Sequence, residues 1–204
     1  WVVLGDLVGY GADPAWVVGW VREQVAAGAI AVLGNHDQAV LAGDVQSMGP
    51  VIGAATAWTR SVLDAGQLEF LRALPLQVVD EDRLYVHANA WAPGEWAYVS
   101  NRLAAARSLL ATPAWLTFCG HVHEPAVYHL QAGAASHFAP TGGVAIPLSS
   151  QRHWLAIPGS CGQPRDGNPA AACAWFDIDS RQLGFLRVPY DHELSARKIR
   201  AAGL

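Results

Sequence analysis

Two short apolar runs that end directly in polar residues, with a helix-forming stretch between them, constrain the fold of this chain most. The runs are Trp1–Leu4, followed by Gly5-Asp6, and Ala29–Leu33, followed by Gly34-Asn35-His36-Asp37. Between them, Asp13-Pro14 supplies an N-cap and a first helical residue, and apolar residues follow at helical spacing. A strand, a helix and a second strand in this order predict a parallel pair joined by a right-handed crossover.

The remaining pattern predicts a mixed α/β chain in which strands dominate the second half. We expect helices at 54–63, 67–74, 101–110 and 194–202, and strands at 76–79, 84–86, 116–119, 154–157, 172–176 and 183–188. Asp179-Ser180 is typical of a hairpin turn. The segment 131–143 is rich in Gly, Ala, Ser and Pro and low in charge, which predicts a long loop, either disordered or functional.

Composition limits the class of protein. The 204 residues fit a single domain spanning 1–204. A hydrophobic content of 52% and a net charge of −4 argue against disorder and against a basic groove for nucleic acid. No apolar run approaches the ~18 residues of a membrane-spanning helix. Three cysteines without close pair spacing, Cys119, Cys161 and Cys173, favour a reducing compartment, and we expect the cytoplasm.

Five potential metal ligands each follow a predicted strand: Asp6, Asn35, His87, His121 and His123. In an open α/β sheet these strand ends converge on one crevice. Carboxylate, amide and imidazole ligands without thiolate favour manganese, iron, zinc or magnesium. Two such ions about 3.5–4 Å apart would polarise a phosphoryl oxygen and convert a bound water into a nucleophile.

His36 differs from these five residues because it lies between a predicted ligand, Asn35, and a carboxylate, Asp37. Asp37 could orient the imidazole by a hydrogen bond, and His36 would then act as a general acid for a leaving alkoxide. Taken singly, each histidine is better explained as a polar residue with satisfied hydrogen bonds. The conjunction of all of them favours a site.

Two further residues have competing explanations. The planar guanidinium of Arg165 suits a substrate phosphate, but an ion pair with Asp166 explains it as well. Cys119 precedes Gly120-His121-Val122-His123, which invites a structural zinc site. Such sites usually contain paired cysteines, so Cys119 is predicted to be part of the strand core.

The ordered motifs resemble those of the calcineurin-like metallophosphoesterases. They are Gly5-Asp6-Leu7-Val8-Gly9-Tyr10-Gly11, Gly34-Asn35-His36-Asp37, Val86-His87 and Gly120-His121-Val122-His123. The segment Pro158–Gly167 is similar to the small bacterial branch of phosphodiesterases and diadenosine tetraphosphatase-like proteins. The resemblance implies a four-layer α/β/β/α sandwich.

The resemblance also implies a role for each matched residue. Asp6 would bridge two divalent metal ions, and His36 would be the catalytic histidine. The second metal would take Asn35, His87 and His121, and His123 would bind the first. The family supplies a further Asp-x-His pair from its opening strand, which the chain beginning at Trp1 does not contain. A strand and helix occupy ~30 residues, so we expect that unit and its pair upstream, in a longer protein. The alternative is a natural truncation with a weakened first metal site.

The sequence therefore predicts a metal-dependent phosphoric ester hydrolase acting on a small phosphomonoester or phosphodiester through a metal-bound hydroxide. Two alternatives stay open: a non-catalytic scaffold with the same fold, and a sensor of phosphate or nucleotide. The expected partner is the small phosphate-ester substrate, with neither long nucleic acid nor membrane. The tryptophan-rich surface leaves assembly into a homo-oligomer open.

Overall fold

The computed structural model describes residues 1–43 and 50–204. They form two compact units, one made of Trp1–Leu76 with Asp191–Leu204 and the other of Gln77–Tyr190. The expectation of a single domain spanning 1–204 stays a prediction. No helix in the described ranges combines the length and the apolar character needed to cross a membrane.

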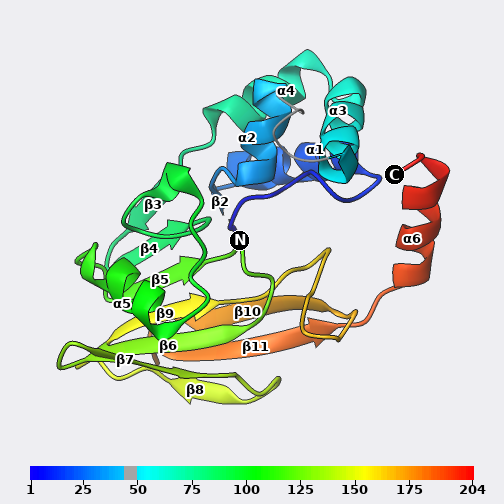
Figure 1. Cartoon of the computed structure of the whole chain (residues 1–204). Helices are drawn as coiled ribbons and strands as arrows, with labels where there is room; N and C mark the ends of the chain where they lie inside the picture. The colour runs from blue at the N-terminus through cyan, green and yellow to red at the C-terminus, as the bar shows by residue number, and fades with distance from the viewer. Residues whose placement is uncertain (44–49) are drawn as a thin grey trace. The chain divides into compact units, whose positions relative to one another are not determined.

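The first unit is built around a short parallel pair of strands (Figure 1). Its elements are β1 (Val2–Val3), α1 (Pro14–Ala26), β2 (Ile30–Ala31), α2 (Asn35–Ala42), α3 (Pro50–Val62), α4 (Ala65–Ala73) and α6 (His192–Ala201). Val2 pairs with Ile30 and Val3 with Ala31, in parallel. The predicted strand–helix–strand unit is therefore confirmed.

The core of this unit brings α1, α2 and α4 together. Val18 and Val21 of α1, Val40 of α2 and Leu71 of α4 are almost completely buried in one cluster. Burying each such side chain contributes about 1.5–3 kcal/mol relative to leaving it exposed. The helices therefore hold the loops that follow β1 and β2.

The second unit contains two sheets and one helix of its own (Figure 1). Its elements are β3 (Gln77–Asp80), β4 (Arg83–Val86), a 3-10 turn η2 (Pro93–Glu95), α5 (Arg102–Leu110), β5 (Leu116–Cys119), β6 (Ala126–Gln131), β7 (Ala134–Phe138), β8 (Ala145–Pro147), β9 (His153–Ile157), β10 (Ala171–Asp177) and β11 (Gln182–Val188). The larger sheet has the order β3-β4-β5-β9-β6-β7, and the smaller has β10-β11-β8. Strands β4, β5 and β9 are mutually parallel.

Strands β4 and β5 of the larger sheet are buried at every position, which explains why most of their residues are apolar. On one face, Leu109 of α5 packs with Val86 and Cys119. On the other, the ring of Phe118 contacts Phe176 of the smaller sheet, with centroids 6.1 Å apart. The parallel strands β4 and β5 end side by side, at Val86 and Cys119.

The prediction of a long loop over 131–143 is wrong for much of its length. Residues Ala134–Phe138 form strand β7, which pairs antiparallel with β6. Ala132 and Gly133 connect the strands with φ values of 50° and 78°. This is a two-residue hairpin turn with left-handed backbone at both positions. The composition of β7 conceals it, because Ala and Ser have little intrinsic strand preference.

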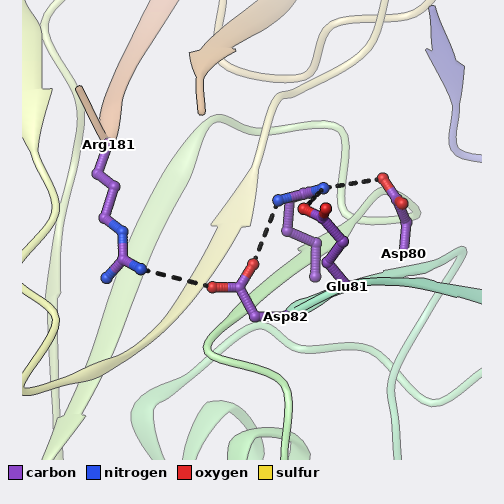
Figure 2. Close-up of polar contacts among 5 residues, drawn as sticks. Asp80, Glu81, Asp82 and Arg181 are labelled. Atoms are coloured by element: carbon purple, nitrogen blue, oxygen red, sulfur yellow. Dashed lines mark hydrogen bonds and ion pairs between the residues drawn. The ribbon is translucent and has the colours of Figure 1, made fainter. Parts of the chain in front are cut away.

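Arg83, the first residue of β4, is the centre of an ion-pair cluster. Its side chain is only 5% exposed and pairs with Asp80 at 3.0 Å, Glu81 at 2.8 Å and Asp82 at 3.2 Å. Figure 2 shows these three carboxylates, with Arg181 on the far side of Asp82 at 3.8 Å. The carboxylates raise the pKa of Arg83 further above its ordinary value, although desolvation opposes this effect. The cluster fixes the tight turn from β3 into β4.

Replacing Arg83 with methionine is expected to lower the free energy of unfolding by about 1–3 kcal/mol. The apolar stem is kept, but three neighbouring carboxylates lose their common partner. Arg72→Met is the matched control, because the Arg72–Glu69 pair is exposed on both sides and is worth about 0–1 kcal/mol. Urea denaturation of both variants measures the difference. Equal losses would show that the cluster adds nothing beyond a surface ion pair.

Candidate metal centre

In the first unit, Asp6 lies directly beyond β1 and faces the first turn of α2. Its backbone has φ 52°, a left-handed conformation that is uncommon for a residue other than glycine. The Asp6 Oδ1 atom accepts a hydrogen bond of 2.9 Å from the backbone N–H of His36. The carboxylate therefore lies at the positive N-terminal end of a helix dipole, where negative charge is stabilised.

Asp37 links the loops that follow β1 and β2 in this unit. It is completely buried, and its Oδ1 accepts from Val8 N–H at 3.3 Å while Oδ2 accepts from Gly34 N–H at 2.9 Å. A buried carboxylate with two backbone donors rigidifies both loops. Its predicted part in catalysis, orienting the His36 imidazole, stays a prediction.

His36 is buried, with 6% exposure, and lies against two neighbours in the loop after β1. The ring of Tyr10 contacts its imidazole, with centroids 4.4 Å apart. A Cβ atom on Gly9 would lie 2.7 Å from the Cβ of His36, and Gly9 has φ +123°. Only glycine therefore fits beside this histidine.

Gly34 allows the closest approach in this unit. A Cβ atom there would lie 2.2 Å from both the backbone N and Oδ1 of Asp6. Asn35, the first residue of α2, follows it and is half-buried. The glycine in Gly34-Asn35-His36-Asp37 is thus a steric requirement for bringing Asp6 to the helix.

Gly34→Ala is expected to lower the free energy of unfolding by at least about 2 kcal/mol, because the new methyl group meets backbone and carboxylate atoms that cannot both move away. Gly19→Ala in α1 is the matched control. No atom lies within 4 Å of its Cβ position, so alanine should raise stability by about 0.5–1 kcal/mol. Thermal unfolding compares the two, and a harmless Gly34→Ala would refute the packing argument.

In the second unit, His87 follows β4 and His121 follows β5, and their rings meet. His87 Nε2 lies 3.1 Å from His121 Nδ1, and both residues are buried. His121 Nε2 lies 2.9 Å from the carbonyl oxygen of Trp96. Because a carbonyl only accepts, His121 Nε2 carries the proton of that bond. In the neutral ring, His121 Nδ1 therefore offers a lone pair next to His87 Nε2.

This arrangement fits a divalent metal ion. Two nitrogen ligands of one ion, each bonded at about 2.1 Å, lie about 3.0–3.4 Å apart in octahedral or tetrahedral geometry. The observed 3.1 Å falls in that range. Metal-binding histidines also characteristically donate their other ring N–H to a carbonyl or carboxylate. His121 satisfies both conditions.

His123 lies two residues further along and is held by a different loop. It is buried and has φ 67°. Its Nδ1 donates to the carbonyl of Gln163 at 2.9 Å. His123, like His121, thus donates one ring N–H to a backbone carbonyl, from Nδ1 instead of Nε2.

Arg165 belongs to the loop that holds His123. Its backbone N–H donates to the His123 carbonyl at 3.2 Å, and its exposed guanidinium contacts Gln163 Oε1 at 2.9 Å. The carboxylate of Asp166 pairs with Arg187. Substrate binding by Arg165 stays a prediction. The backbone of Arg165 is hydrogen-bonded to His123.

Cys119 is confirmed as part of the strand core. The residue is completely buried, and burial raises the pKa of its thiol to about 12. At neutral pH it is therefore a protonated thiol rather than a thiolate ligand.

Sequence reasoning missed Asn89, Tyr98 and the Trp96 and Gln163 carbonyls, which hold the histidines. A backbone carbonyl has no sequence signal of its own. The only indication in the sequence is that the loop after His87 directly follows a predicted ligand.

Comparisons with known proteins agree with these features. The sequence model of the calcineurin-like phosphoesterase superfamily domain matches residues 2–181. An uncharacterized protein of Methanocaldococcus jannaschii is 32% identical over 201 residues, covering 96% of this chain and 78% of its own. The crystal structure of a metallophosphoesterase from Sphaerobacter thermophilus is similar with TM-score 0.85 and 36% identity, covering 98% of this chain and 82% of that one.

A hypothetical protein of Pyrococcus horikoshii OT3 shares the fold with a TM-score of 0.76 at 17% identity, covering 100% of this chain and 80% of the other. The predicted α/β metallophosphoesterase fold is confirmed by the similarity to the Sphaerobacter thermophilus structure and by the family match. The matched residues 2–181 include the motifs from Gly5-Asp6 to His123. The chain belongs to the calcineurin-like phosphoesterase superfamily.

Proposed function

We propose that this chain hydrolyses a small phosphomonoester or phosphodiester at a centre of two divalent metal ions. The observation that carries the proposal is the His87–His121 pair, whose ring nitrogens lie 3.1 Å apart while the outer nitrogen of His121 donates to a carbonyl. Two buried imidazoles held in this way are suited to binding an ion. Membership of the phosphoesterase superfamily supports the reaction type.

Five residues are proposed as ligands. Asp6 would bridge the two ions, and His123 would bind the first. Asn35 would join His87 and His121 at the second. The oxygen and nitrogen donors, without thiolate, favour manganese, iron, zinc or magnesium. Bound ions of this kind polarise a phosphoryl oxygen and acidify water.

The chain's own residues would supply the remaining steps. His36, buried against Tyr10, would donate a proton to the leaving oxygen of the ester. Arg165 would hold a substrate phosphate oxygen, since a guanidinium donates two parallel hydrogen bonds to such a group. Asp37 would orient the His36 imidazole, and it accepts bonds from the backbone N–H groups of Val8 and Gly34 in the loops beside it.

We further propose a small substrate and a reducing compartment. The net charge of −4 disfavours a long polyanion such as nucleic acid. Cys119, Cys161 and Cys173 are free thiols, as is usual for proteins of the cytoplasm.

The test is a combined metal and activity measurement on protein expressed from the complete reading frame. Elemental analysis should find bound divalent metal, and added manganese should support hydrolysis of p-nitrophenyl phosphate or bis(p-nitrophenyl) phosphate. Metal binding without hydrolysis of either ester would favour a phosphate or nucleotide sensor. One ion or none, again without hydrolysis, would favour a scaffold. Both outcomes would remove the enzyme proposal.

A further inference from the structure

His121 is contacted from two sides by one segment of the second unit, residues 89–98. The carbonyl oxygen of Trp96 accepts from His121 Nε2 at 2.9 Å, at the edge of the ring. The ring of Tyr98 lies flat against the imidazole face, with centroids 3.9 Å apart and planes 15° from parallel. His121 is thus fixed in both translation and tilt before any ligand is present.

The segment 89–98 is itself closed by a buried amide. Asn89 has no exposed surface, and its Oδ1 accepts from Ala92 N–H at 2.9 Å while its Nδ2 donates to the Ala97 carbonyl at 2.9 Å. Ala90 N–H donates to Ser108 Oγ of α5 at 3.0 Å. These bonds hold the carbonyl of Trp96, where the backbone has left-handed φ 57°.

We propose that residues 89–98 form a positioning clamp on His121, closed by Asn89 and faced by Tyr98. The clamp holds His121 in the tautomer protonated on Nε2, so that Nδ1 is presented next to His87 Nε2. A free imidazole samples both tautomers, and an ion that needs Nδ1 would have to select one of them. Because the clamp already fixes the tautomer, metal binding does not have to select it. The benefit to metal binding rests on the proposed function, but the tautomer does not.

Tyr98 acts through its ring in this proposal. Its side chain is 51% exposed, so removing it does not open a buried cavity. Losing this stack of rings frees His121 to tilt. Phenylalanine keeps the ring and loses only the hydroxyl group, which separates positioning from any hydroxyl chemistry.

The first test reads the tautomer directly in metal-free protein. In ¹⁵N nuclear magnetic resonance spectra above the titration range of histidine, His121 should show one protonated nitrogen, Nε2, and one unprotonated nitrogen, Nδ1. Asn89→Ala should bring the two shifts together. Asn168→Ala is the matched control, because Asn168 accepts a similar bond from Ala170 N–H in an exposed loop. Averaged shifts in the unmodified protein would overturn the clamp, whatever the activity.

The second test measures affinity for Mn²⁺ alone by calorimetry. Tyr98→Ala should weaken binding 10- to 100-fold, the usual cost of losing a partner of a metal ligand. Tyr98→Phe and Tyr190→Ala, the exposed-tyrosine control, should bind as the unmodified protein does. An equal loss in Tyr98→Phe would assign the effect to the hydroxyl group and refute the clamp. A fixed tautomer in a protein without hydrolysis would retain the clamp and reject the enzyme.

Discussion

Replacing His121 with asparagine is expected to remove most of the bound metal and to lower kcat/KM at least about 100-fold, or about 2.7 kcal/mol of transition-state stabilisation. The variant deletes one of two imidazoles whose nitrogens lie 3.1 Å apart. Asparagine is chosen because the backbone at His121 has φ 63°, a conformation that this residue tolerates better than alanine does. Elemental analysis and ester hydrolysis measure the two effects.

The control for this variant is His137→Asn. His137 is exposed on β7 and contacts the ring of Tyr128, so its loss should leave metal content and turnover unchanged. A His121→Asn protein that keeps its metal and its activity would contradict the ligand assignment. Far-ultraviolet circular dichroism confirms that both variants are folded.

Replacing His36 with alanine should give a different result: kcat falls by about 10²–10⁴-fold, the usual contribution of a general acid, while metal content stays close to that of the unmodified protein. His36 contributes its backbone N–H to Asp6, and alanine retains that bond. Only the imidazole is lost. His192→Ala, at the exposed start of α6, is the control and should change neither quantity.

The leaving group makes the His36 prediction sharper. A p-nitrophenolate departs without a proton, whereas an alkoxide needs one. The loss in His36→Ala should therefore be several times larger for an alkyl phosphate ester than for the p-nitrophenyl ester. The same loss for both esters would assign His36 to substrate binding or structure rather than to proton donation.

The ends of the strands, and the polar residues that follow them, could be predicted from the sequence. His87 and His121 were placed beyond two predicted strands, and β4 and β5 do end side by side, which brings these two rings together. Apolar runs indicate these two strands because β4 and β5 are buried at every position. The parallel pair of β1 and β2 followed from the same logic.

The groups that hold the histidine rings of the candidate site could not be predicted from local sequence pattern. Asn89 closes its loop through backbone groups, and the Trp96 and Gln163 carbonyls act through atoms that every residue possesses. Their role depends on contacts made across the fold and not on local pattern. Strand β7 was missed for a related reason, since it exists by pairing with β6 rather than by its own propensity.

The left-handed backbone at Asp6, His121 and His123 has an implication for protein engineering. Each of these residues has φ between 52° and 67°, which glycine adopts without strain and which costs other residues about 1–3 kcal/mol. A directed-evolution screen that rewards heat resistance alone would therefore select glycine at these positions. It would enrich variants that are more stable but lack the proposed metal-binding side chains. Libraries of this chain should be sorted on metal retention before they are sorted on melting temperature.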